Sequence, residues 1–129
     1  MKTIEQVMSA HCEIPAHLVA ETEVPLCSGL QRQGDVLVRP TRKSAKAGVR
    51  IPKDGVPVVR GENGGNTHLL VGDGTWASVE GDLLELGVVD VETECYLMHP
   101  EHGAQGLAPG SYVISRQREQ ADEIRRVQD

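Results

Sequence analysis

Two histidines on either side of a proline and a glutamate are the residues of this sequence best suited to chemistry. His99, Pro100, Glu101 and His102 read HPEH and precede the glycine-rich segment 103–110. Neutral imidazole is a common ligand for zinc, iron, copper and nickel, and Glu101 could ligate the same ion or act as a base. His68 is the candidate for a third ligand from a neighbouring strand. Small cupin-like barrels hold a divalent transition metal in this way.

The spacing of these histidines does not match a specific metal motif. The HExxH pattern is absent, because only two residues separate His99 from His102. The strand pattern HxH is also absent, because residues 66–68 read Asn-Thr-His. A histidine near a turn is more often a solvent-facing or hydrogen-bonded loop residue. The sequence therefore leaves two interpretations open, a metal site at His68, His99, His102 and Glu101, or loop histidines and no cofactor.

The chain contains no complete set of residues for covalent catalysis. Ser111 lacks the GxSxG surroundings of a nucleophile elbow. Cys95 lies four residues before His99, but its place in a predicted strand indicates a buried, inert thiol. The three cysteines include no CxxC pair, which predicts neither a zinc knuckle nor a disulfide framework. We therefore assign no catalytic residues and favour a protein that is not an enzyme, while the metal-protein interpretation leaves an enzymatic role open.

Charge is separated into blocks along the chain, whose net charge is −6. Residues 32–60 carry eight basic groups against two acids, whereas residues 61–115 carry nine acids and no Lys or Arg. The basic segment 39–53 has no aromatic residues, on which single-stranded nucleic acids would stack. We expect it to pair with acidic side chains of the same or a neighbouring subunit rather than with nucleic acid. The residues assigned to such interactions are Arg39, Arg42, Lys43, Lys46, Arg50, Arg116 and Arg118.

Short apolar runs between turn residues predict an all-β fold. Runs at 36–38, 56–59 and 69–71 are bounded by Gly, Pro, Asp or Asn, as strands are. A longer run at 83–92 contains Gly87, which can mark a bulge, and a separate strand follows at 93–100. Roughly six to nine short antiparallel strands would form a small single-domain barrel or sandwich. The glycines at 106–110 are expected to turn the chain between its last two strands.

The first thirty-one residues differ from the rest. Ile4, Val7 and Met8 fall at helical spacing, and Pro15 and Pro25 interrupt any longer helix. We predict an irregular N-terminal arm at 1–31 and the barrel or sandwich domain at 32–129. The arm could be disordered or could drape over a neighbouring subunit. In the polar tail, the spacing of apolar residues permits a short helix.

The composition suggests a thin core. Apolar residues make up 39% of the chain and aromatic residues 2%, with no Phe, and small chains with thin cores often gain stability by oligomerisation. No run approaches the roughly 20 apolar residues of a transmembrane helix. The N-terminus also lacks the apolar core of a signal peptide. We therefore expect a cytoplasmic protein with no membrane contact.

Several segments resemble a family of small, uncharacterised proteins encoded by bacteria and phages. The segments are GDVLVRP at 34–40, HPEH at 99–102, LAPGSYVISRQRE at 107–119 and RRVQD at 125–129. Similar sequences often carry His-x-His in the middle turn, where this chain has Asn66 and His68. The resemblance implies one compact β-domain and carries no particular activity with it.

Three functional hypotheses follow from the sequence. The leading one is a non-enzymatic β-domain that acts through self-association, as a homo-oligomeric or assembly-forming structural protein. The second is a cupin-like metal protein that uses His68, His99 and His102. The third is a nucleic-acid accessory protein that uses the basic segment 39–53.

Overall fold

The computed structural model describes residues 1–12, 14, 16–59, 67–79 and 84–116. These residues form one short helix and nine strands, which confirms the prediction of a small all-β domain. In chain order the elements are α1 (Ile4–Met8), β1 (Leu26–Cys27), β2 (Gln31–Gln33), β3 (Val36–Pro40), β4 (Val49–Arg50), β5 (Val56–Val59), β6 (His68–Ser78), β7 (Glu85–His99), β8 (Gly103–Leu107) and β9 (Gly110–Arg116). None of the helices in these residues is long enough and apolar enough to span a membrane.

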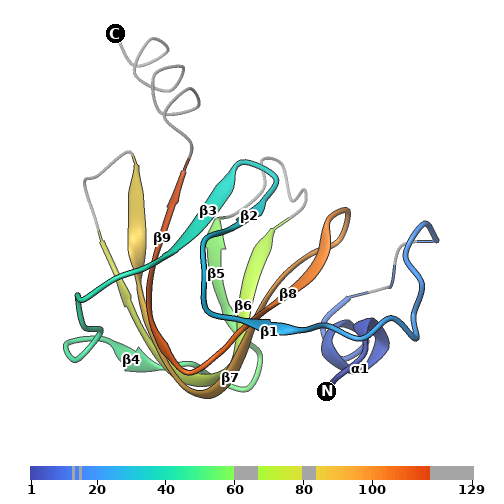
Figure 1. Cartoon of the computed structure of the whole chain (residues 1–129), viewed down its shortest axis with the longest axis horizontal. Helices are drawn as coiled ribbons and strands as arrows, with labels where there is room; N and C mark the ends of the chain where they lie inside the picture. The colour runs from blue at the N-terminus through green and yellow to red at the C-terminus, as the bar shows by residue number, and fades with distance from the viewer. Residues whose placement is uncertain (13, 15, 60–66, 80–83, 117–129) are drawn as a thin grey trace, which may run out of the picture.

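The long, bent strand β7 organises the sheet (Figure 1). It pairs with β6 along one edge and with both β8 and β9 along the other. The strand order is β1-β8-β7-β9-β3-β2, and β4 and β5 pair with β6. The pairs are antiparallel apart from β1 with β8. The sheet curls on itself and forms a half-barrel.

Two strand predictions need correction. Segments 83–92 and 93–100 do not form two strands but lie mostly within β7, because the polar residues Glu92 and Thr93 are exposed on a continuous strand rather than in a turn. The register shift between Glu85 and Gly87 confirms the predicted irregularity at that glycine. The sheet thus contains strands of 11 and 15 residues, β6 and β7, among the short ones.

The segment 106–110 does not turn a hairpin between the last two strands. Strand β8 pairs with residues 95–99 of β7, and β9 pairs with residues 85–91 of the same strand. The two strands therefore follow one another along a single edge of β7. The hairpin in this region joins β7 to β8, with the register His99↔Gly103 at its end. Consequently Pro100, Glu101 and His102 form a tight hairpin turn.

The core has two parts, one on each face of the sheet. Alternate residues of a strand point to opposite faces, so Leu97 and Leu70 face the interior of the half-barrel while Tyr96 and Val71 face outward. The inner cluster also contains Trp76. On the outer face, α1 buries all three residues of the predicted helical stripe against the sheet. The N-terminal arm therefore packs on its own domain.

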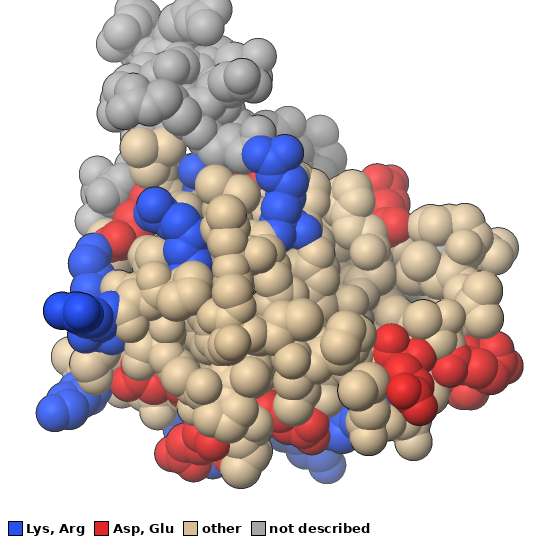
Figure 2. Space-filling view, in the orientation of Figure 1, with Lys and Arg blue, Asp and Glu red and all other residues tan. Residues whose placement is uncertain are grey.

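The basic segment folds back onto the acidic residues of the same chain. The Lys43 Nζ lies 2.6 Å from a Glu85 carboxylate oxygen, and Arg50 forms ion pairs with Asp73 and with Glu92, the latter at 2.8 Å. Asp90 accepts hydrogen bonds from the backbone of this segment and from serine side chains. Figure 2 shows Lys and Arg gathered towards one side of the molecule and Asp and Glu mainly along its lower part. The expected pairing with acidic groups thus occurs within the chain.

Glutamine side chains join strand β2 to β8 in place of a backbone ladder. The Gln31 Nε2 donates to the Gly106 carbonyl at 3.1 Å, and the Gln105 side chain donates to the Arg32 carbonyl. The buried Gln33 donates to the Leu97 carbonyl at 2.8 Å. These bonds hold the β2–β3 hairpin over the end of β7, where the candidate site lies.

Candidate metal centre

The fold brings the three predicted histidines together at one end of the half-barrel. His68 begins β6, His99 ends β7 and His102 lies in the turn that follows. The ring centroids of His68 and His99 are 4.4 Å apart, and those of His99 and His102 are 4.5 Å apart. His68 and His99 are buried, with 4% and 6% of their surface exposed, while His102 is exposed. We call these three residues the histidine cluster.

The hydrogen bond to Gln33 fixes the protonation of the His68 ring. Gln33 Oε1 lies 2.9 Å from His68 Nδ1, and the Gln33 amide nitrogen faces the Leu97 carbonyl. Because that carbonyl can only accept, the amide must present its oxygen to His68. Nδ1 therefore carries the hydrogen of the neutral ring, and Nε2 keeps its lone pair.

The lone pair of His68 lies opposite a carboxylate. Asp35, in the turn between β2 and β3, places Oδ1 3.7 Å from His68 Nε2. Two acceptors that face each other repel unless a proton or a cation lies between them. A metal bound to both atoms at about 2.1 Å in tetrahedral geometry would hold them roughly 3.4 Å apart. The observed separation is close to that of two ligands sharing an ion.

His99 is held by the turn that follows it. Its Nδ1 accepts hydrogen bonds from the backbone N–H groups of Glu101, at 3.0 Å, and of His102, at 3.3 Å. The neutral His99 ring therefore carries its hydrogen on Nε2. In this arrangement His99 orders the turn, and it could ligate a metal only by giving up these bonds.

His102 and Glu101 complete the group from the turn itself. One ligand atom each from His99, Glu101 and His102 lie within 4.8 Å of one another. The Nε2 of His102 also lies against the β2–β3 turn, since a Cβ on Gly34 would be 2.9 Å from it. Both the His102 and His68 rings thus face the Gly34–Asp35 turn.

Burial keeps the two inner histidines neutral. Desolvation, reinforced by the nearby His99, lowers the pKa of His68 to about 4 although Asp35 opposes this shift. Desolvation, followed by the charge of His102, also lowers the pKa of His99. Neutral imidazoles are the form that binds metal. At neutral pH the His68 and His99 rings are therefore unprotonated.

The lowered pKa of His68 predicts an acid-sensitive fold in the metal-free protein. The unfolded chain binds a proton at His68 near pH 6.5, whereas the folded protein does so only near pH 4. Stability should therefore fall as the pH drops through this window, by about 2 kcal/mol between pH 7 and pH 5. Urea unfolding at both pH values measures the effect. A His68→Gln variant should lose most of this dependence, and an equal pH dependence in that variant would contradict the assignment.

The other residues considered from sequence lie away from the histidine cluster. Cys95 is fully buried, and burial raises the pKa of its thiol to about 12, as expected of an inert core cysteine. The Ser111 hydroxyl donates to Asp90 at 2.7 Å. Among the residues assigned to interactions, Lys43 and Arg50 form the ion pairs described above. Arg39, Arg42, Lys46 and Arg116 form no ion pair with the described part of the chain, and Arg118 and the polar tail lie outside the described residues.

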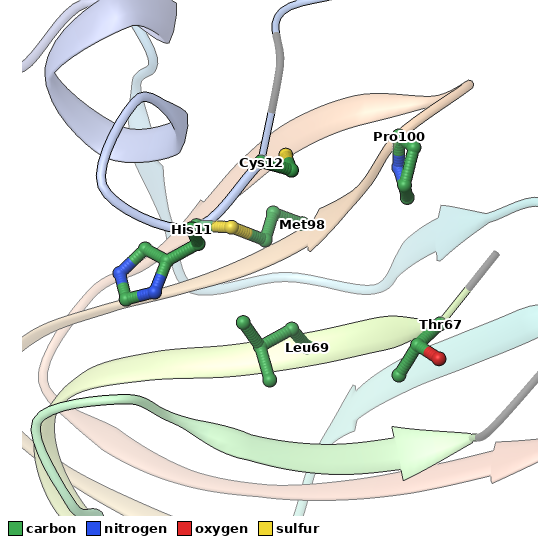
Figure 3. A pocket seen from close by; sticks show the side chains of 6 residues that line it. All are labelled: His11, Cys12, Thr67, Leu69, Met98 and Pro100. Carbon is green, nitrogen blue, oxygen red and sulfur yellow. The ribbon is translucent and has the colours of Figure 1, made fainter. Parts of the chain in front are cut away.

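A pocket lies between the segment that follows α1 and the sheet (Figure 3). Its volume is about 140 Å³. Thr67 and Leu69 line it from one side, and they alternate with His68 along the chain and so point away from the cluster. The remaining lining residues are His11, Cys12, Met98 and Pro100. The pocket is therefore separate from the candidate metal centre.

Sequence reasoning missed three residues of the site, Gln33, Gly34 and Asp35. The register Gln33↔Val36 shows that Gly34 and Asp35 form a two-residue hairpin loop. Gly34 has a φ of 60°, a conformation that glycine adopts without strain. The Gly-Asp pair was recognisable as a turn signal. Nothing in the sequence, however, indicated that this turn lies over residues 68 and 102.

The fold and the cluster define a small all-β domain with a candidate site for a metal ion. Residues 32–117 match a family model described as a domain of unknown function, DUF8820. Because this match covers most of the chain, the protein belongs to that family. No curated protein and no solved structure matches the chain.

Proposed function

We propose that this protein binds a divalent first-row transition metal at the histidine cluster. The observation that carries the proposal is the convergence of His68, His99 and His102 from separate parts of the fold. They meet beside the carboxylates of Asp35 and Glu101. Core histidines that serve packing alone would have their ring nitrogens satisfied by protein groups, whereas His68 Nε2 faces another acceptor.

The site supplies the chemistry that such an ion requires. Imidazole nitrogen and carboxylate oxygen are the usual ligands of Zn²⁺, and they also suit Fe²⁺, Co²⁺ and Ni²⁺. Two carboxylates would balance the charge of the ion, and three neutral imidazoles would add none. The partial exposure of the site gives an ion a path from solvent.

Two other hypotheses from the sequence receive less support from the geometry. Self-association was inferred from a thin core, separated charge blocks, a loose N-terminal arm and the lack of a complete catalytic set. The core instead has an inner and an outer cluster, and Lys43 and Arg50 pair within the chain. The same ion pairs occupy part of the basic segment proposed for nucleic acid. Both hypotheses stay predictions, which light scattering and filter binding would test.

Thermal unfolding with added metals tests the proposal. Metal-free protein should gain roughly 5–10 °C in Tm at a Zn²⁺, Co²⁺ or Ni²⁺ concentration about 100 times the Kd, because an ion that binds only the folded state stabilises it by about 2.7 kcal/mol there. Mg²⁺ and Ca²⁺, which prefer all-oxygen sites, should produce little change. The protein must carry no affinity tag of histidines.

The matched control removes a histidine that lies outside the cluster. A His11→Ala variant should gain the same rise in Tm as the natural sequence, because His11 lies on the other face of the sheet. A Tm that no first-row metal raises would overturn the proposal. An equal rise in a variant lacking both His68 and His102 would assign the binding to another site.

A further inference from the structure

We infer that the β2–β3 turn is part of the metal centre, with Asp35 as its carboxylate ligand and Gln33 as the residue that directs His68 towards it. This inference rests on the proposed metal binding and specifies its ligand atoms. They are His68 Nε2 and the carboxylate of Asp35, whose Oδ1 lies 3.7 Å from that nitrogen. The carboxylate ligand then comes from the β2–β3 turn rather than from the HPEH turn.

The position of Gln33 determines which nitrogen of His68 is available. Gln33 is 1% exposed, and its amide nitrogen lies 2.8 Å from the Leu97 carbonyl and 3.4 Å from that of Gly103. These two acceptors fix the orientation of the amide, so that its oxygen accepts the hydrogen of His68 Nδ1. Partners of this kind orient metal-bound histidines in other proteins and strengthen metal binding. Gln33 is therefore a positioning residue, which does not itself contact the ion.

The turn also provides space for His102. A Cβ on Gly34 would lie 2.9 Å from His102 Nε2 and 3.2 Å from Cδ2. Glycine at this position lets the imidazole approach the backbone of the turn, next to Asp35. The ring planes of His68 and His102 differ by only 12°, with centroids 6.3 Å apart. The two rings thus lie roughly parallel, each about 4.5 Å from the His99 ring, and face the same turn.

The ligand set indicates the class of ion. Imidazole nitrogen and carboxylate oxygen are ligands of catalytic zinc sites and of non-haem Fe²⁺ sites. Asp35 is 41% exposed, so an ion held here would have solvent on one side. The predicted ions are therefore Zn²⁺, Fe²⁺, Co²⁺ and Ni²⁺ rather than Cu⁺ or Ca²⁺.

Titration of Zn²⁺ into the metal-free natural sequence and four variants tests the ligand role of Asp35. Asp35→Asn removes a proposed ligand and should weaken binding by at least about tenfold, because even the loss of a partner outside the coordination shell typically costs that much. Asp54→Asn is the matched control, since Asp54 is an exposed acid before a glycine in another turn, and it should bind as the natural sequence does. Gln33→Leu should also weaken binding about tenfold or more, and Gln33→Glu, which restores an acceptor for Nδ1, should recover affinity relative to Gln33→Leu.

The ¹⁵N NMR spectrum of the metal-free protein supplies a readout that needs no ion. His68 should be the Nδ1–H tautomer in the natural sequence and in Gln33→Glu, and should change its tautomer in Gln33→Leu. An Nε2–H tautomer in the natural sequence overturns the inference. Equal Zn²⁺ affinity in Asp35→Asn and the natural sequence overturns it too, while leaving the proposed function standing. No Zn²⁺, Fe²⁺, Co²⁺ or Ni²⁺ binding by the natural sequence overturns the proposed function and the ligand role of Asp35 with it.

Discussion

Replacement of His68 by glutamine should reduce the affinity for Zn²⁺ by at least about 100-fold, the upper end of the loss seen for partners outside the coordination shell. His68 is buried at the start of β6 and directs Nε2 towards Asp35. Glutamine retains a polar side chain that can hydrogen bond to Gln33 but has no imidazole nitrogen. Titration calorimetry on the metal-free proteins measures the difference.

The control for this variant is His17→Gln. His17 is exposed, and its ring nitrogen lies 2.7 Å from the Glu101 carbonyl, outside the histidine cluster. Its replacement should change the Zn²⁺ affinity by only a few-fold. A loss in His17→Gln as large as that in His68→Gln would show that the turn matters and that His68 is not a specific ligand. Circular dichroism should confirm that both variants are folded.

Replacement of Trp76 by alanine should destabilise the fold by about 3–5 kcal/mol, the usual cost of removing a large buried aromatic side chain. Trp76 is 6% exposed and belongs to the inner core cluster. Its ring lies on the backbone of Gly87, where an added Cβ would be 2.4 Å from Cη2. The side chain therefore fixes β6 against β7 beside the irregular register. Because Trp76 is the only tryptophan, urea unfolding should be followed by circular dichroism.

The matched control for the core is Val49→Ala. Val49 is 65% exposed on the short strand β4, so its truncation should change the free energy of unfolding by less than about 0.5 kcal/mol. Total stabilities of small domains are about 5–15 kcal/mol, so Trp76→Ala should shift the urea midpoint markedly. A loss below about 1 kcal/mol in Trp76→Ala would contradict the described packing around β6 and β7.

Features that depend on short-range sequence patterns could be predicted from the sequence. The helical spacing of Ile4, Val7 and Met8 gave the position of α1, and alternation placed Tyr112 and Ile114 on one face of β9, where both belong to the inner core cluster. The proximity of the three histidines was also anticipated, because a histidine on one strand and two on a later loop can meet in a small β-domain. These predictions depend only on short-range patterns and on the small number of histidines.

The remaining features depend on long-range geometry. Polar residues at 92–94 suggested a break, but solvent reaches them on a bent, continuous β7. The length of β7 lets it pair with both β8 and β9, which the prediction of two separate strands at 83–92 and 93–100 could not show. The role of Gln33 and Asp35 depends on the curl that carries the β2–β3 turn over the end of β7. No pattern within residues 31–40 encodes that contact.

Elemental analysis of the protein, produced without a histidine tag, tests the central claim most directly. After incubation with Zn²⁺, Fe²⁺, Co²⁺ or Ni²⁺ and exhaustive dialysis, the natural sequence should retain a stoichiometric amount of at least one of these metals. A variant carrying both His68→Gln and His102→Gln should retain almost none. The absence of any stoichiometric transition metal from the natural sequence, or equal retention by the double variant, would contradict metal binding at the histidine cluster.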